Sequence, residues 1–121
     1  MSDAGKERIL EWLRATPPGR GMLVRGIRFN DATFFSDVDA REFPVSALEQ
    51  AWRIVADTFQ VLSAQRLPPM RLSWTHERII LYCARRDDGT IFGTFVSRRA
   101  ADFDLSALHK MLTDFQQLRV D

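Results

Sequence analysis

Three stretches of the chain repeat apolar residues three and four positions apart, the spacing of one face of an α-helix. Pro17-Pro18 ends the first stretch and Pro68-Pro69 the second, because proline disfavours helical backbone in the residue before it. Ser2 or Asp3 can cap the first stretch. The predicted helices run from Ala4 to Thr16, from Pro44 to Gln65 or Leu67, and onward from Asp104, which is itself a good cap.

Between the helices, apolar and polar residues alternate over shorter stretches that are bounded by turn residues, a pattern typical of β-strands. Asn30-Asp31-Ala32 and His76-Glu77 are predicted turns. Asp39 to Phe43 is predicted as a polar loop, and Asp87-Asp88-Gly89 is a strong hairpin turn because glycine accepts a positive φ. The predicted strands are Met22 to Phe29, Thr33 to Val38, Met70 to Thr75, Arg78 to Arg85 and Thr90 to Ser97.

The resulting order is α-β-β-α-β-β-β-α, and it predicts one α/β (α+β) domain over residues 1–121. We expect a five-stranded, mostly antiparallel sheet, with the two terminal helices on one side and the long middle helix on the other. In the first strand, alternation places Met22 and Val24 on one face and Leu23, Ile27 and Phe29 on the other. Gly26 marks a bulge or a close packing contact.

The apolar run from Ile79 to Ala84 is predicted to be a central strand that is covered on both faces. In the last helix, the periodicity predicts one buried apolar stripe. Its members are Leu105, Leu108, Met111, Leu112, Phe115 and Leu118.

The middle helix has apolar residues on an unusually wide arc. Around Val55, its core stripe contains Leu48, Ala51, Trp52, Phe59 and Leu62, and a second stripe contains Ala47, Ile54 and Val61. The total arc approaches roughly 200°, whereas a helix packed on one sheet needs about 100°. One interpretation is that another element of the chain covers the second stripe, or that the stripe is partly exposed. The other is that a partner covers it, most simply a second copy of the chain.

A single helix also cannot cover one face of five strands, so an apolar area of the sheet is expected to need a partner as well. Trp74 fits either the core or an interface, where tryptophan is enriched among residues that dominate binding. The predicted dimer or partner interface comprises Ala47, Ile54, Thr58, Val61, Leu72 and Trp74.

Charge is nearly balanced, with 17 basic and 16 acidic residues, which argues against nucleic acid as a partner. Arg85-Arg86 and Arg98-Arg99 are the only adjacent basic pairs. We predict that both are solvated strand-end residues; the alternative is a role toward phosphate or an acidic partner. No apolar run approaches the length of a membrane span, and the amino terminus has no apolar signal core, so we expect no membrane insertion.

The single cysteine, Cys83, excludes an internal disulfide and fits a reducing compartment, so the cytoplasm is the expected location. Cys83 lies in the most apolar strand, where a thiol is usually inert. The histidines, His76 and His109, have no ligand or base partner at a suitable spacing. Gly19-Arg20-Gly21 lacks the Lys-Ser/Thr of a phosphate-binding loop.

Two carboxylate pairs, Asp37 with Asp39 and Asp87 with Asp88, are better explained by turn preference than by acid–base chemistry. We therefore predict a binding protein that is not an enzyme and has no catalytic residue, cofactor or metal.

This element order resembles that of the roadblock/dynein light-chain superfamily over nearly the whole chain. The resemblance rests on the short first helix, the hairpin from Met22 to Val38, the long helix from Pro44, the meander from Met70 to Val96 with its Asp88-Gly89 turn, and the final helix. One departure is the first hairpin turn, where family members often have Asp-Gly and this chain has Asn30-Asp31-Ala32.

The resemblance implies a homodimer in which the long helices of two subunits lie side by side and the third strands, Met70 to Thr75 here, join two sheets into one. It also implies a regulatory or scaffolding role, since bacterial relatives pair with small Ras-like GTPases. Two alternatives remain: a secretion-type chaperone, although those tend to be acidic, and a small-molecule sensor of profilin-like or PAS-like architecture with a ligand cavity.

Overall fold

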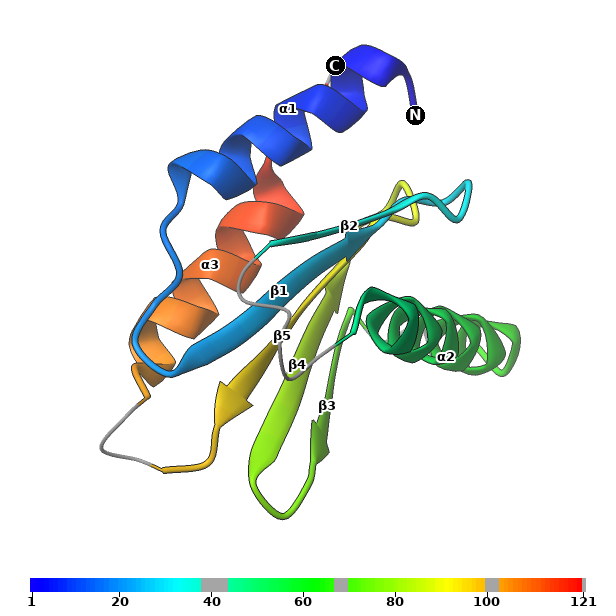
Figure 1. Cartoon of the computed structure of the whole chain (residues 1–121). Helices are drawn as coiled ribbons and strands as arrows, with labels where there is room; N and C mark the ends of the chain where they lie inside the picture. Colours follow the sequence, from blue (N-terminus) through cyan, green and yellow to red (C-terminus); the bar gives the residue numbers. More distant parts are fainter. Residues whose placement is uncertain (38–43, 67–69, 100–102, 121) are drawn as a thin grey trace.

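A computed structural model describes residues 1–37, 44–66, 70–99 and 103–120 (Figure 1). It confirms the predicted order of helices and strands. The elements are α1 (Asp3–Ala15), β1 (Met22–Arg28), β2 (Phe34–Asp37), α2 (Val45–Ala64), β3 (Arg71–Thr75), β4 (Ile79–Arg85), β5 (Ile91–Ser97) and α3 (Leu105–Gln117). The predicted loop at Asp39 to Phe43, the strand end at Val38 and the helix stop at Leu67 to Pro69 lie outside the described residues.

The five strands form one sheet in the order β2-β1-β5-β4-β3, and every neighbouring pair is antiparallel. The middle strand of the five is β5, and β4 is an interior strand beside it, as its apolar run predicts. β5 holds the middle place because β1 of the first hairpin pairs with it. β4 still has a strand on each side and packs on both faces, which accounts for its continuous apolar run.

The helices lie as predicted, with α1 and α3 on one face of the sheet and α2 alone on the other (Figure 1). Each face has its own apolar cluster. The two-helix face contains Ile9, Leu13, Ile27, Phe92, Leu108 and Phe115 among others, and the α2 face contains Val24, Leu48, Trp52, Val55, Phe59, Leu81, Cys83 and Ile91. Among the described residues, no helix is long and apolar enough to cross a bilayer.

The residues of β1 alternate as predicted, except at its beginning. Val24 packs on the α2 face, and Ile27 and Phe29 pack on the two-helix face. Met22 was predicted to share the face of Val24, but it joins the cluster of Ile27 instead. The pairing of β1 with β5 shifts register between Met22 and Val24, so the bulge lies there and not at Gly26.

Gly26 instead marks a close contact with α2. It pairs across the sheet with Gly93 of β5, and the indole of Trp52 lies against both. A Cβ atom on Gly26 would be 2.9 Å from the indole, and one on Gly93 would be 2.8 Å from it. Trp52 is fully buried, with the rings of Phe34 and Phe95 at centroid distances of 5.6 and 5.7 Å. Two glycines opposite each other thus make the seat for the largest side chain of α2.

Side chains satisfy the backbone groups at the amino ends of α1 and α3. The Ser2 hydroxyl accepts a hydrogen bond from the Gly5 amide at 3.1 Å, and the Asp104 carboxylate accepts one from the Ala107 amide at 3.0 Å. In α2, Pro44 is the residue just before the helix and not part of its first turn; its carbonyl accepts from the Leu48 amide.

Two buried arginines hold the carboxyl ends of the terminal helices. Arg25 is 2% exposed and donates to the carbonyls of Leu13 and Thr16, where α1 ends, while forming an ion pair with Asp37. Arg86 is 7% exposed and donates to the carbonyls of Phe115 and Leu118, where α3 ends. The unsatisfied carbonyls and negative dipole of a helix end favour a cation at both places.

The prediction that Arg85-Arg86 is simply a solvated pair was therefore wrong for Arg86. The turn between β4 and β5 places it under the last turn of α3, and Asp88 provides its counter-charge at 3.0 Å. The turn itself is as predicted, because Gly89 has a φ of +91°. In the first hairpin turn, which has no glycine, Ala32 takes a φ of +72°, and the Asp31 carboxylate accepts from the Thr33 amide at 3.0 Å.

The stripe on α3 is confirmed except at its two ends; at its last member, Leu118 directly follows the helix and is only partly buried. Leu108, Met111, Leu112 and Phe115 are buried, whereas Leu105 is 47% exposed. Leu105 follows the cap residue Asp104 directly, so it lies at the end of the helix beyond the sheet cluster.

The close contact of Trp52 with Gly26 and Gly93 can be tested by adding a methyl group to one glycine. Gly93→Ala should lower the free energy of unfolding by about 1–3 kcal/mol, because the new methyl group would overlap Trp52 and press on the Cys83 sulfur at 3.1 Å. Chemical denaturation checks this. Gly19→Ala is the matched control and should cost less than about 1 kcal/mol. Its new methyl comes closest to the flexible end of Met22 at 3.1 Å and meets the Ala107 Cβ at an ordinary contact distance of 3.5 Å. Equal losses of unfolding free energy for the two variants would contradict a close contact between Trp52 and Gly93.

Two leucines of α3 test the depth of its stripe. Leu108→Ala should lower the free energy of unfolding by about 2–5 kcal/mol, as expected for a cavity left by a fully buried leucine. Leu105→Ala should change it by less than about 1 kcal/mol, because that side chain is half exposed. A small loss of melting temperature for Leu108→Ala would remove this leucine from the core.

Candidate functional site

The outer face of α2 carries the second apolar stripe that the sequence predicts. Ile54 is 58% exposed and Val61 is 61% exposed, and Ala47 is exposed in line with them. No described residue covers these side chains, so the stripe is exposed in the described part of the chain, which one of the predicted alternatives allows. Thr58 is half-buried beside Ile54, and its hydroxyl donates to the Ile54 carbonyl at 2.9 Å. The Thr58 hydroxyl therefore has a hydrogen-bond partner within the helix and adds no unsatisfied polar group to the apolar stripe.

The second part of the predicted interface lies on β3, an edge of the sheet. Leu72 is half-buried and packs against the α2 cluster, whereas Trp74 is 38% exposed. Four of the five residues of β3 are exposed. Among the described residues no strand pairs with the outer side of β3, so its backbone donors and acceptors can accept another strand.

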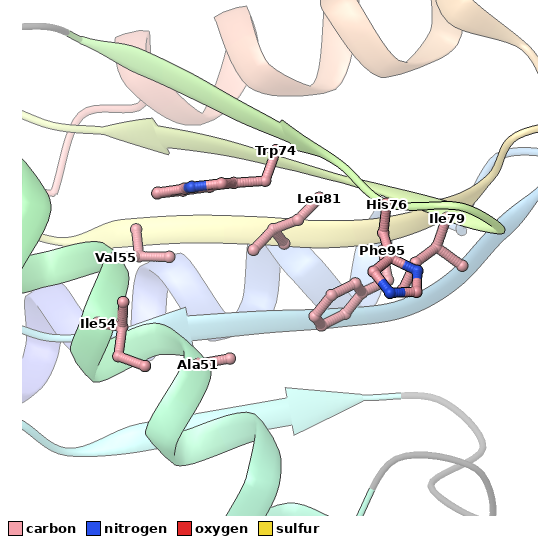
Figure 2. A pocket seen from close by; sticks show the side chains of 8 residues that line it. All are labelled: Ala51, Ile54, Val55, Trp74, His76, Ile79, Leu81 and Phe95. Carbon is pink, nitrogen blue, oxygen red and sulfur yellow. The ribbon is translucent and has the colours of Figure 1, made fainter.

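The structure joins these two parts around one apolar hollow of about 280 Å³ between α2 and the β3–β4 hairpin (Figure 2). Ile54 and Trp74 lie on opposite walls of the hollow. The other lining residues are Ala51, Val55, His76, Ile79, Leu81 and Phe95. Of the six predicted interface residues, the hollow thus brings together Ile54 and Trp74. Val61 and Thr58 line a neighbouring depression that also includes Ile54.

Sequence reasoning missed His76, Ile79 and Phe95 as parts of this surface. Ile79 and Leu81 are two positions apart in β4 and so share a face. Leu81 pairs directly with Phe95, and Trp74 pairs with Leu81 on the other side. The alternation of residues in β4 could have indicated from the sequence that Ile79 lies on this surface. For Phe95, however, the strand order was needed, because it is separated from Trp74 in the sequence.

The polar groups with candidate chemistry have structural partners. Burial raises the pKa of the Cys83 thiol far above its usual range, so the thiol stays protonated and unreactive. The hydrogen bond from Lys6 holds the pKa of Asp31 well below its usual range, with Thr33 adding to the effect. Asp88 likewise has a lowered pKa: its partial burial acts against ionisation, but hydrogen bonds from Thr90 and Arg86 outweigh that.

The remaining residues with candidate metal-binding or acid–base chemistry do not form a common site. His76 lies at the hollow and His109 is exposed on α3. Asp37 is engaged by Arg25, and its predicted partner Asp39 lies outside the described residues. Within residues 1–37, 44–66, 70–99 and 103–120, no group of three or more His, Cys, Asp or Glu side chains could hold a metal ion. The surface on α2 and β3 is the candidate functional site, and its chemistry is that of apolar and backbone contacts.

Comparison with solved structures identifies the fold. By sequence alone, no family model and no curated protein matches the chain. The gliding protein MglB of Thermus thermophilus superposes with a TM-score of 0.68 at 15% identity, over 97% of this chain and 89% of that one. Myxococcus xanthus MglB superposes with a TM-score of 0.64 at 8% identity, over 78% of this chain and 77% of that one. At such identities the likeness shows the shared fold alone.

Proposed function

We propose, from the fold shared with MglB, that this chain is a homodimeric protein-binding module that regulates or scaffolds a small Ras-like GTPase. The observation that carries the proposal is the exposed apolar stripe of α2 beside Trp74 and the open edge of β3. Residues 1–121 would form one roadblock-like domain that works in the cytoplasm.

The first support for a dimer is the geometry of the stripe. Ile54 and Val61 are seven residues apart and lie in line along α2, so two antiparallel copies of the helix can pack stripe against stripe. Their exposed parts, together with that of Trp74, are apolar area that gains free energy when water is removed, by about 25 cal/mol per Å².

The second support is the β3 edge. A stable interface buries about 1,200–2,000 Å² in total, more than a few helix side chains can supply. Antiparallel pairing of β3 with the β3 of a second copy would add backbone hydrogen bonds and would extend each sheet into the other. Both contacts can form in one symmetric arrangement because α2 and β3 flank the same hollow.

The GTPase part of the proposal comes from the family. Two solved structures that share this fold are MglB proteins, and the one from Thermus is described as a gliding protein. The roadblock resemblance implies that bacterial relatives pair with small Ras-like GTPases. A small-molecule sensor is less well supported, because the lining of the hollow is apolar apart from His76 and the indole nitrogen of Trp74. No observation favours a secretion-type chaperone.

The role of the α2 stripe in dimerisation can be tested by placing one charged side chain in it. Ile54→Asp should convert the dimer into a folded monomer, because the carboxylate would have to lose its water inside the seam. Light scattering on a sizing column, over a dilution series, measures the mass. Wild type should give twice the mass of the chain at low micromolar protein.

Gln60→Asp, an equal change of charge at an exposed position on another side of α2, is the control and should remain dimeric. A dimeric Ile54→Asp variant would show that the seam lies elsewhere. A wild-type monomer would contradict the dimer itself.

Binding of a GTPase is tested with the purified Ras-like GTPases of the same organism. We expect one of them, loaded with GDP or with a non-hydrolysable GTP analogue, to co-elute with the wild-type dimer and to change its rate of nucleotide hydrolysis or exchange. Complex formation should depend on which nucleotide is bound. If none co-elutes in either state, the GTPase part of the proposal is wrong, whatever the mass of the chain.

A further inference from the structure

One end of the sheet collects basic side chains from three separate segments. Backbone hydrogen bonds join these segments: the Ser97 amide donates to the Gly21 carbonyl at 2.9 Å, and the Arg98 amide donates to the Arg78 carbonyl at 3.1 Å. The Asp104 amide donates to the Arg20 carbonyl at 3.2 Å. The α1–β1 loop, the β3–β4 turn and the residues after β5 therefore meet at the end of the sheet that is lowest in Figure 1.

The four arginines at this end, Arg20, Arg78, Arg98 and Arg99, are all exposed, and we call them the basic end. None of them forms an ion pair with a carboxylate among the described residues. Two described acidic residues are close to these arginines in the sequence: Glu77 is exposed in the β3–β4 turn, and Asp104 is engaged as the cap of α3. The chain as a whole has a net charge of only +1, so this is a local concentration of positive charge.

The basic end continues directly into the apolar hollow. The guanidinium of Arg98 donates to the carbonyl of His76 at 3.0 Å and to that of Glu77 at 3.4 Å, so it holds the β3–β4 turn. His76 and Ile79, on either side of that turn, line the hollow together with Phe95. In Figure 2 these three side chains gather at one end of the hollow, away from Ile54.

We propose that the basic end and the adjoining end of the hollow bind an acidic segment of a partner protein. An apolar side chain of the segment enters the hollow beside Phe95 and Ile79, and its carboxylates meet the arginines. A hollow of about 280 Å³ is enough for one large apolar side chain. Arginine suits this task because its planar group donates two parallel hydrogen bonds to a carboxylate.

A protein segment fits this surface better than a bilayer does, because a flat lipid surface cannot place an apolar group in a hollow that lies between a helix and a hairpin. In the proposed dimer the second copy lies against the stripe of α2 and the edge of β3, whereas His76, Ile79 and Phe95 line the other end of the hollow. The proposal depends neither on the α2 seam nor on a GTPase.

The test uses a short fluorescein-labelled peptide that carries one phenylalanine among aspartates and glutamates, and fluorescence anisotropy with the full chain. The double variant Arg78→Glu, Arg99→Glu should weaken binding by at least about tenfold, because two exposed attractions become repulsions. This variant retains Arg98 and thus its hydrogen bonds to the turn. Arg8→Glu, which reverses an exposed charge on α1, should leave binding unchanged.

Two further probes separate the two parts of the site. Alanine in place of the phenylalanine should weaken binding, and so should amides in place of all the carboxylates. Equal affinity of wild type and the double variant for the acidic peptide would overturn the proposal, provided that thermal melting shows both to be folded. It would also be overturned if the amide peptide bound as well as the acidic one, or if anionic phospholipid vesicles bound while the peptide did not. The sizing-column mass of the double variant should equal that of wild type, which keeps this result independent of the dimer.

Discussion

The contact of Trp52 with the glycine pair Gly26 and Gly93 determines how α2 sits on the sheet. Both glycines lack the Cβ atom that would otherwise keep the indole away, so the helix can approach closely at this point. Trp52 is fully buried, and Ile54, two residues later, points roughly the opposite way around the helix. The seat that buries Trp52 therefore also turns Ile54 and Val61 outward. The exposed stripe is a consequence of core packing and not a defect in it.

The opposite face of the sheet is closed by a different kind of interaction. Arg25 and Arg86 are buried beneath the ends of α1 and α3, where they donate to the last carbonyls, and each has its own carboxylate. Buried ion pairs of this type add little net stability, but removal of one partner is costly, so they specify where the helices end on the sheet. With both terminal helices held on one face, α2 remains alone on the other.

This division of the helices locates the binding surfaces. A single helix leaves part of its face of the sheet open, and the opening is bounded by α2, the β3 edge and the β3–β4 hairpin. One end of the hollow adjoins the apolar stripe, which suits a second copy, and the other end adjoins the arginines, which suit acidic groups. A chain of near-zero net charge can in this way present an apolar seam and a charged site side by side.

The sequence by itself determined the element order, the turn at Gly89, the cap at Asp104 and the second apolar stripe of α2, because each depends on neighbours within a few residues or on helical periodicity. The tertiary structure decided the central position of β5, the face of Met22 and the burial of Arg86. It also decided the grouping of Phe95 with Trp74, and of Arg20 with Arg78. These features depend on which strands pair and in what register, and pairing between distant segments leaves no periodic signal in a single sequence.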